Sequence, residues 1–267
     1  MQIISIVNRR GGVGKTATAH ALGAGLAHRG HRVLFVDLDS QSNLSFDLGV
    51  INAPAGSFEM MTGEKAPADL IRQAGDNMDI IPATPELSLA DTKLTQTGRE
   101  YKLRDALEPI RGNYDYVIID TPPALGILTV NALTASDKCI IPAQAEIHSL
   151  QGIKLLQEAI EAVQRYTNPR LEIAGILLTR YNKRAIISKD MRANLEGIAG
   201  QIGTILFSTP IRECTAIKEA QAMQTDIFTY SPRSNAVLDY TPLIDAIERD
   251  SGQTEGPGQQ AQALANQ

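Results

Sequence analysis

The sequence predicts an α/β fold in which a doubly wound, mostly parallel sheet carries helices on both faces. Short apolar runs alternate with stretches of helical periodicity along most of the 267 residues. Most of the runs are apolar throughout, as in parallel strands that are buried on both sides. A glycine-rich segment follows the first run, and sheets of this kind bind ligands at the carboxyl ends of their strands.

The predicted elements follow this alternation in chain order. We expect strands at 3–7, 33–36, 78–81, 116–119, 139–141 and 173–178, with shorter candidates at 205–207 and 226–228. We expect helices at 15–27, 85–95, 100–110, 126–135, 148–166, 186–199, 214–223 and 234–249. Residues 49–76 have no clear pattern, so they are expected to lie outside the central sheet.

Length and composition predict a single domain at residues 1–250, followed by a disordered polar tail at 251–267. The tail is rich in Gly, Gln and Ala, has Glu255 as its one charge, and lacks an apolar stripe. No apolar run approaches the roughly 20 residues of a membrane-spanning helix. The first strand begins near Gln2, which leaves no room for a signal peptide.

Charge and cysteine content narrow the functional classes further. The net charge is −5, so any binding of nucleic acid must come from a local basic patch and not from the overall field. The two cysteines, Cys139 and Cys214, are isolated from each other in the sequence. Two free thiols in a reducing cytoplasm are therefore expected.

The segment at 9–16, Arg-Arg-Gly-Gly-Val-Gly-Lys-Thr, predicts a phosphate-binding loop between a strand and a helix. Glycines let the backbone turn so that N–H groups face phosphate oxygens, and the start of the helix adds a positive dipole. Lys15 would reach the β- and γ-phosphates, and the Thr16 hydroxyl would bind Mg²⁺. An ordinary glycine-rich turn is the alternative. The candidate nucleotide-contacting residues are Arg10, Gly11, Gly12, Val13, Gly14, Lys15, Thr16 and Ala17.

Acidic residues follow two of the other predicted strands. Asp37 and Asp39 share one side of a strand end because side chains alternate along a strand. One could order Mg²⁺ and its waters while the other orients an attacking water. The alternative is that both acids cap the following helix. Asp120 ends the apolar run at 116–119, the arrangement of a Walker B carboxylate that holds Mg²⁺ through water.

Several of these segments together resemble the ParA/MinD family of deviant Walker ATPases. The strict Walker A pattern would place Gly at Arg9, whereas the family loop is Lys-Gly-Gly-x-Gly-Lys-Thr, with Arg10 here in place of its first lysine. The segment at 37–41 is similar to the family's Asp-x-Asp-Pro-Gln, with Ser40 replacing Pro. Residues 120–133, Asp-Thr-Pro-Pro-Ala-Leu-Gly-Ile-Leu-Thr-Val-Asn-Ala-Leu, resemble the ParA-type partition ATPases. The resemblance covers about residues 2–249 and is weak at 50–100.

The resemblance implies particular roles for these residues. Asp39 would be the hydrolytic carboxylate, and Asp37 would lie on the Mg²⁺ side. Arg10 would cross to the nucleotide of the partner subunit, although Arg and Lys are not interchangeable at a tightly defined site. Pro210, Ile211 and Arg212 follow a short predicted strand where the family packs the adenine. A plain loop is the alternative for that last segment.

The resemblance also implies a function: a weak ATPase that uses ATP/ADP and Mg²⁺ as a switch. In this family an ATP-bound homodimer binds double-stranded DNA non-specifically, and a ParB-like centromere-binding protein stimulates hydrolysis. This implies a cytoplasmic, nucleoid-associated protein without a membrane partner. The alternatives are a MinD-like positioning regulator, which needs a C-terminal amphipathic helix, and a P-loop small-molecule kinase. The isolated cysteines do not fit the superfamily's iron–sulfur reductases.

A basic stretch between Gln164 and Ala193 is opposed only by Glu172 and Asp190. Such a run can simply be a solvated face. If it binds DNA, phosphate contacts suffice, and the low aromatic content argues against a stacking platform for single strands. The candidate DNA-binding residues are Arg180, Lys183, Arg184, Lys189, Arg192 and Lys218.

We expect duplex DNA binding to require ATP and to weaken steeply with salt, because neutralised phosphates release counterions. Gel shifts with ATP, with ADP and without nucleotide, over a series of salt concentrations, measure both effects. Binding that ignores ATP and shows a flat salt response would contradict the expectation.

Overall fold

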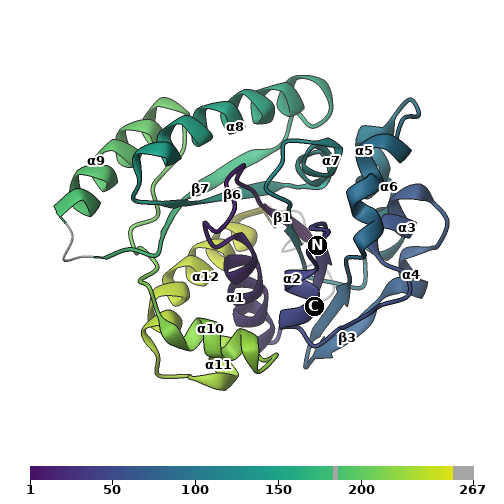
Figure 1. Cartoon of the computed structure of the whole chain (residues 1–267), viewed down its shortest axis with the longest axis horizontal. Helices are drawn as coiled ribbons and strands as arrows, with labels where there is room; N and C mark the ends of the chain where they lie inside the picture. Colours follow the sequence, from purple (N-terminus) through teal and green to yellow (C-terminus); the bar gives the residue numbers. More distant parts are fainter. Residues whose placement is uncertain (183–185, 255–267) are drawn as a thin grey trace, which may run out of the picture.

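The computed structural model describes residues 1–182 and 186–254, and in 147–151, 186–189 and 252–254 it describes the backbone alone. Within these residues, seven strands form one sheet in the order β3-β4-β2-β5-β1-β6-β7 (Figure 1). The pairs that involve β1, β2, β5, β6 and β7 are parallel, and β3 pairs with β4 antiparallel. The predicted doubly wound, mostly parallel sheet is confirmed.

Six of the seven described strands agree with the apolar runs to within a few residues, and β3 is the exception. Their bounds are β1 (Gln2–Ile6), β2 (Val33–Asp37), β3 (Arg72–Gly75), β4 (Met78–Ile81), β5 (Tyr116–Asp120), β6 (Lys138–Gln144) and β7 (Glu172–Thr179). Every residue of β2, β5 and β6 is buried, as expected for strands covered on both faces.

The helices are α1 (Lys15–His28), α2 (Asn43–Asp47), α3 (Ser57–Thr62), α4 (Pro67–Leu70), α5 (Ala90–Lys93), α6 (Lys102–Leu107), α7 (Ile127–Ala135), α8 (Ile147–Tyr166), α9 (Ile186–Gln201), α10 (Thr215–Ala222), α11 (Ile227–Tyr230) and α12 (Asn235–Thr254). The longer helices occupy the predicted connections, whereas the short helices α2, α3, α4 and α11 lie where no helix was predicted. Short 3₁₀ turns at 85–89, 99–101 and 108–110 break the predicted helices there into pieces. Of the helices described, none is both long and apolar enough to cross a bilayer.

The helices divide between the two faces of the sheet (Figure 1). On one face, α1 packs with α10, α11 and α12 in a core that includes Leu22, Phe35 and Tyr240. On the other face, α3, α6 and α7 cover the strands around β5, while α8 and α9 cover β6 and β7. Helix α1 therefore lies between the sheet and the C-terminal helices, and its first turn faces the carboxyl edge of the strands.

Two predicted strand assignments differ from the structure. Residues 226–228 begin α11 because the Asp226 carboxylate accepts hydrogen bonds from the N–H groups of Phe228 and Thr229 at 2.8 and 2.9 Å, and so caps a helix. The run at 205–207 forms an isolated bridge through Leu206 to Ile176. Part of the segment expected outside the sheet, β3, joins its edge as a hairpin with β4, in which Asn77 takes a positive φ of 58°.

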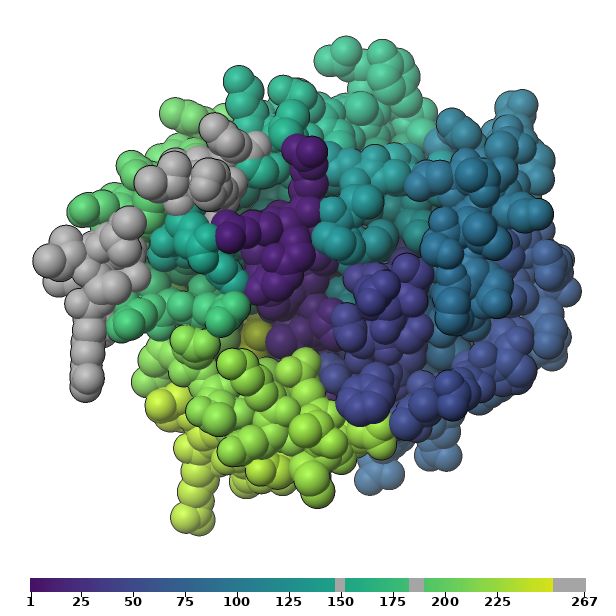
Figure 2. Space-filling view, in the orientation of Figure 1, coloured from purple at the N-terminus to yellow at the C-terminus, as the bar shows by residue number. Residues whose placement is uncertain are grey.

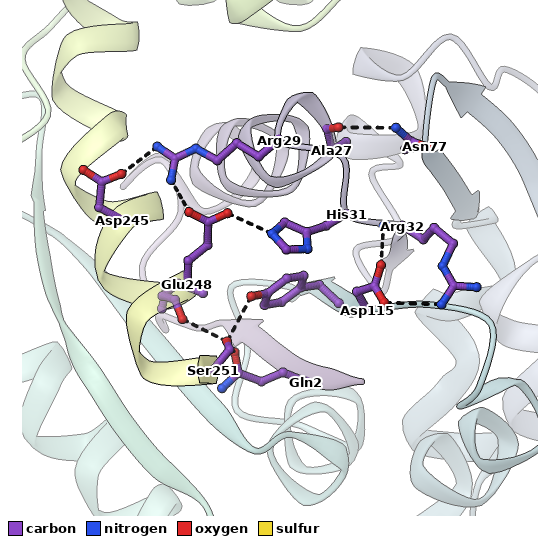
Figure 3. Close-up of polar contacts among 12 residues, drawn as sticks. Gln2, Ala27, Arg29, His31, Arg32, Asn77, Asp115, Asp245, Glu248 and Ser251 are labelled. Atoms are coloured by element: carbon purple, nitrogen blue, oxygen red, sulfur yellow. Dashed lines mark hydrogen bonds and ion pairs between the residues drawn. The ribbon is translucent and has the colours of Figure 1, made fainter. Parts of the chain in front are cut away.

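The expected boundary at residue 250 falls inside α12, which continues to Thr254; residues 255–267 lie outside the described part of the chain. Side chains from the amino-terminal half hold this end of the helix (Figure 3). Arg29 pairs with Asp245 and Glu248, and His31 lies 2.8 Å from Glu248. The Tyr116 hydroxyl meets Ser251 Oγ at 3.0 Å. These long-range contacts extend the helix beyond the point where composition predicts disorder.

Close packing of α1 on the sheet predicts a cost for adding one methyl group. A Cβ at Gly23 would lie 2.2 Å from the buried ring of Phe35, which is too large and rigid to move aside. We expect Gly23→Ala to lower the free energy of unfolding by about 1–3 kcal/mol, the usual cost of overpacking. Urea denaturation followed by circular dichroism measures the change.

The control for this substitution is Gly197→Ala in α9, where no atom lies within 4 Å of an added Cβ. That variant should be more stable by about 0.5–1 kcal/mol because Ala has the better helix propensity. Equal effects of the two substitutions would contradict the packing inferred for α1.

Candidate functional site

The carboxyl ends of β1, β2 and β5 bring the predicted loop and two carboxylates to one edge of the sheet. In the strand register, Ile6 at the end of β1 pairs with Asp120, and Asp37 pairs with Asp120 on the other side. Strand β1 lies between β5 and β6. The chain runs from β1 to β2, which lies beyond β5, whereas β6 lies on the opposite side of β1. This reversal of strand order is where doubly wound sheets bind ligands.

The loop after β1 takes a backbone conformation that requires glycine. Gly12 and Gly14 have φ values of 74° and 86°, where a side chain would be strained. Gln144 Nε2 donates to the Gly12 carbonyl at 2.7 Å, and the Thr179 hydroxyl donates to the Val13 carbonyl at 2.8 Å. With these carbonyls held by the ends of β6 and β7, the loop can offer backbone N–H groups to an anion.

Helix α1 begins at Lys15, directly after this loop, so its positive end points at the same place. Arg9, Gly11 and Gly12 are exposed. Figure 2 shows the purple amino-terminal segment reaching the surface near the centre of this face, between the teal and the yellow-green parts of the chain. The loop is therefore open to a ligand from solvent.

Lys15 is only 7% exposed, and its Nζ donates to the Arg10 carbonyl at 3.1 Å. Burial lowers the pKa of its ammonium group, although Asp120 and Asp39 act in the opposite direction. A poorly solvated ammonium group lying across a loop of N–H donors is suited to neutralise a phosphate.

Thr16 and Asp120, both predicted as Mg²⁺ residues, contact each other. The Thr16 hydroxyl donates to Asp120 Oδ2 at 2.7 Å. Asp120 Oδ1 is buried, and no described residue donates a hydrogen bond to it. Burial and the nearby Asp37 raise the pKa of Asp120 well above its usual value. A buried carboxylate oxygen without a donor, beside a hydroxyl, fits a hard divalent cation such as Mg²⁺.

Asp37 is buried, and its oxygens accept from protein donors. Ser45 donates to Oδ2 through its N–H at 2.9 Å and its hydroxyl at 2.7 Å, and Asp39 N–H donates to Oδ1 at 3.1 Å. Burial raises its pKa to about 6, although these hydrogen bonds oppose the shift. Ser45 lies in the first turn of α2, so Asp37 satisfies one N–H at the start of this helix. The N-cap residue itself is Ser42, so the alternative that both acids cap the helix is not met in that form.

Asp39 lies nearer the opening of the site and is only partly buried. Its Oδ1 accepts from the N–H of Gln41 at 3.0 Å, which orients the carboxylate within the turn before α2. Of the two acids, Asp39 is thus the accessible one and Asp37 the one enclosed by protein.

Arg10 lies at the rim of the loop and is engaged within its own chain. Its Nη2 is 2.5 Å from the Glu146 carboxylate, with 37% of the arginine side chain exposed. Its N–H donates to Asn8 Oδ1 at 2.9 Å, and Asn8 Nδ2 donates to the Pro142 carbonyl at 2.6 Å. Contact with a partner subunit would require Arg10 to leave Glu146.

A cavity of about 260 Å³ opens beside the loop and contains part of the predicted adenine segment. Ile211 and Arg212 line it together with Gly12, Gly14 and Ala17, whereas Pro210 does not. The Arg212 guanidinium is fixed by Asp239, with Nη2 2.6 Å from Oδ1. Sequence analysis missed five further lining residues: Glu213, Cys214, Ile217, Gln221 and Tyr240.

The described candidates for DNA binding already have acidic partners. Glu213 lies 3.1 Å from Arg180 and 3.8 Å from Lys218, and all three line the same cavity. Arg192 pairs with Glu196 at 3.1 Å. Lys183 and Arg184 lie outside the described residues, and Lys189 is described only in its backbone. A DNA-binding role for these six residues stays a prediction.

Sequence analysis missed the residues that brace the loop and the acids: Asn8, Ser45, Gln144 and Thr179. Gln144 and Thr179 end the long buried strands β6 and β7, so each is a polar residue directly after an apolar run. That pattern could have identified both. Nothing local marks Ser45, because its contact with Asp37 depends on how α2 folds back.

A glycine loop between a parallel strand and a helix, with acids ending the neighbouring strand β5 and the next strand β2, defines a P-loop nucleotide-binding fold. Residues 1–173 match the family model described as an AAA domain. The chain is 39% identical to the sporulation initiation inhibitor protein Soj of Bacillus subtilis, over 92% of this chain and 98% of Soj. It is 38% identical to the chromosome partitioning protein ParA of Caulobacter vibrioides, over 94% and 96% of the two chains.

Two solved structures have a fold similar to that of this chain. Cobyrinic acid a,c-diamide synthase from Mycobacterium smegmatis, with bound ADP and magnesium, superposes with a TM-score of 0.83 at 32% identity, over 96% of this chain and 97% of that one. Apo McdA of Cyanothece gives a TM-score of 0.83 at 26% identity, over 93% and 98%. The chain belongs to the family of ParA/Soj-type ATPases, and the resemblance predicted from its motifs is confirmed.

Removing the charge of Asp120 tests the electrostatics of the site. In the unfolded chain this carboxyl ionises near its usual pKa of 3.8, whereas in the folded protein it holds its proton to higher pH. Its contribution to stability is therefore lost as pH rises above about 4. Without metal or nucleotide, Asp120→Asn should therefore be the more stable protein at neutral pH, with the difference vanishing toward pH 3.

Urea unfolding of both proteins across this pH range measures the difference. The matched control is Asp115→Asn, at a partly exposed acid. Burial alone would raise the pKa of Asp115, but the hydrogen bonds and charge of Arg32 outweigh it and lower that pKa, so removal of this acid should destabilise at neutral pH. An Asp120→Asn variant that is less stable than the parent at neutral pH would contradict this account.

Proposed function

We propose that this protein is an ATP-dependent partition ATPase that acts in DNA segregation. The observation that carries the proposal is the convergence of Lys15, the Thr16–Asp120 pair and Asp39 around one glycine loop. The Soj and ParA relatives, which match nearly the full length of both chains, support partition as the purpose of that site.

ATP or ADP with Mg²⁺ is the cofactor that these residues fit. Thr16 and Asp120 would hold the metal, whose charge neutralises phosphate oxygens, with Asp37 behind them as an enclosed acid. The loop at residues 10–17 would hold the phosphates through backbone N–H groups. The cavity beside Ile211 would take the base, with the fixed guanidinium of Arg212 at its edge.

Hydrolysis requires a water molecule in line with the γ-phosphate, and we assign to Asp39 the role of orienting it. Phosphoryl transfer depends mainly on positioning and charge neutralisation. Lys15 supplies a poorly solvated positive charge, and Asp39 supplies an accessible acceptor held by the N–H of Gln41. Slow turnover by the isolated protein follows if a further positive group must arrive from outside the chain.

The proposed consequence of ATP binding and hydrolysis at this site is a change of oligomeric state. In the proposed cycle ATP joins two copies into a dimer that binds double-stranded DNA non-specifically, and hydrolysis stimulated by a ParB-like protein releases them. Arg10 leaves Glu146 in the dimer and approaches the nucleotide of the partner subunit. Exchanging an exposed ion pair for a charged phosphate favours that step, because surface ion pairs contribute little.

Molecular mass measured with each nucleotide tests the switch. We expect a monomer with ADP, a dimer with ATP, and an ATP dimer that persists in Asp39→Ala because hydrolysis is slow there. Arg10→Ala should weaken the ATP dimer at least about tenfold, as for loss of a charge-assisted contact. Light scattering coupled to size-exclusion chromatography gives both results.

Arg9→Ala is the matched control, since it removes the neighbouring, exposed arginine of the same loop. It should leave the ATP dimer unchanged. ATP hydrolysis without any change of mass would contradict the switch, and phosphorylation of an acceptor would favour the small-molecule kinase. Equal dimerisation of the Arg10→Ala and parent proteins would contradict the role of Arg10 alone.

A further inference from the structure

The segment that joins β6 to α8 lies directly beside the phosphate loop and contacts it at several points (Figure 1). Gln144, the last residue of β6, donates from Nε2 to the Gly12 carbonyl at 2.7 Å. The carbonyl of Gln144 accepts from the N–H of Glu146 at 2.8 Å, in a tight turn that follows the strand. Gln144 therefore fixes the position of Glu146 relative to the loop.

The Glu146 carboxylate is directed to the loop and not to its own helix. Glu146 is the N-cap residue of α8, a position from which a side-chain oxygen often accepts from the first N–H groups of a helix. Its side chain makes no such hydrogen bond to the described backbone of α8. The carboxylate instead lies 2.5 Å from Arg10 Nη2. A substitution that removes its charge therefore breaks the pair with Arg10 and costs no capping hydrogen bond.

Arg10 is held weakly in this position. The side chains of Arg10 and Glu146 are 37% and 46% exposed, so water and salt screen their attraction. Arg10 Nη1 is buried and has no acceptor among the described residues. A buried N–H group without an acceptor is costly, and movement of the guanidinium onto another anion would relieve that cost. Arg10 thus has a resting position from which a second anion can release it.

A phosphate group competes well with a carboxylate for a guanidinium. It carries more negative charge, and it accepts two parallel hydrogen bonds from the planar fork of the arginine. In the proposed dimer, Arg10 breaks its pair with Glu146 before it reaches the nucleotide of the partner subunit. Each of the two subunits breaks its own pair, so the cost of release enters the dimerisation equilibrium twice.

We propose that Glu146 holds Arg10 in an inhibitory position and thereby sets the concentration of ATP-bound protein at which the dimer forms. This inference rests on the proposed function, in which Arg10 contacts the partner's nucleotide. An exposed ion pair forms with an equilibrium constant of about 2–5, so each subunit has Arg10 available for only a minor fraction of the time. Because both subunits must release Arg10, loss of the two pairs tightens the dimer on the order of tenfold.

The dissociation constant of the dimer tests this role. Analytical ultracentrifugation of the full chain, with Mg²⁺ and a non-hydrolysable ATP analogue, gives the constant without turnover. We expect Glu146→Gln, which keeps the size of the side chain and removes its charge, to tighten the dimer about tenfold. In an Arg10→Ala background the same substitution should change the constant by less than about twofold, because the residue that Glu146 holds is absent.

Glu158→Gln is the matched control for Glu146→Gln. Glu158 is an exposed acid of α8, and its removal changes the net charge equally. This variant should leave the dissociation constant within about twofold of the parent value. The proposal is overturned if Glu146→Gln and Glu158→Gln tighten the dimer equally, or if Glu146→Gln tightens it equally with and without Arg10.

Chemical labelling of Arg10 without nucleotide tests the pair independently of the ATPase cycle. Phenylglyoxal modifies accessible guanidinium groups, and mass spectrometry follows Arg10 beside Arg9, an exposed arginine of the same loop. We expect Glu146→Gln to raise the labelling rate of Arg10 by about twofold to fivefold and to leave that of Arg9 unchanged. Circular dichroism checks folding, and an unchanged Arg10 rate would overturn the proposal.

The two measurements separate this inference from the proposed function. If no variant dimerises with the ATP analogue, the proposed function is contradicted and the inhibitory role with it, while the labelling rates still show whether Glu146 restrains Arg10. A parent protein that dimerises, together with a Glu146→Gln variant whose dissociation constant equals that of the parent, contradicts the inhibitory role alone.

Discussion

The contact between Thr16 and Asp120 is the interaction on which the rest of this site depends. It joins the first turn of α1 to the end of β5, and so sets the glycine loop against the acids of the sheet edge. It also leaves one Asp120 oxygen buried without a donor from the described residues. A parallel sheet places such an oxygen where a cation and a phosphate can satisfy it, at the ends of adjacent strands. The electrostatic cost of that buried oxygen is thus also a source of affinity for a charged ligand.

Hydrogen bonds from two sides hold the loop and the acids at this carboxyl edge of the sheet. Gln144 and Thr179 hold the loop's carbonyls from β6 and β7, and Ser45 holds Asp37 from α2. Asp39 is left accessible between them, and Arg10 is held at the rim by Glu146. The rigid parts therefore suit phosphate and metal, while the groups with a proposed role in hydrolysis and assembly lie at the surface. This separation of a rigid binding site from exposed switching groups suits a protein that changes its binding partner with the bound nucleotide.

Helix α1 connects this edge with a second acidic region. Lys15 begins the helix and His20 lies about one and a half turns later, with Gly23 close against Phe35. His20 is buried among groups that do not satisfy its Nε2, and Asp47 approaches from α2. Helix α2 carries both Ser45, which bonds Asp37, and Asp47, which with His20 lines a second cavity where the end of α1 meets the start of α11.

Local sequence determined six of the seven described strands, the phosphate loop that contains Lys15 and Thr16, and the acids at 37, 39 and 120. Each is a pattern within a few residues: an apolar run, a glycine spacing, or an acid at a strand end. Only the tertiary structure decided that Arg10 pairs with Glu146, that Asp37 is enclosed by Ser45, and that α12 continues past residue 250. It also decided which residues surround the two cavities. Those contacts join residues far apart in the chain, and their partners depend on burial and packing that no local pattern encodes.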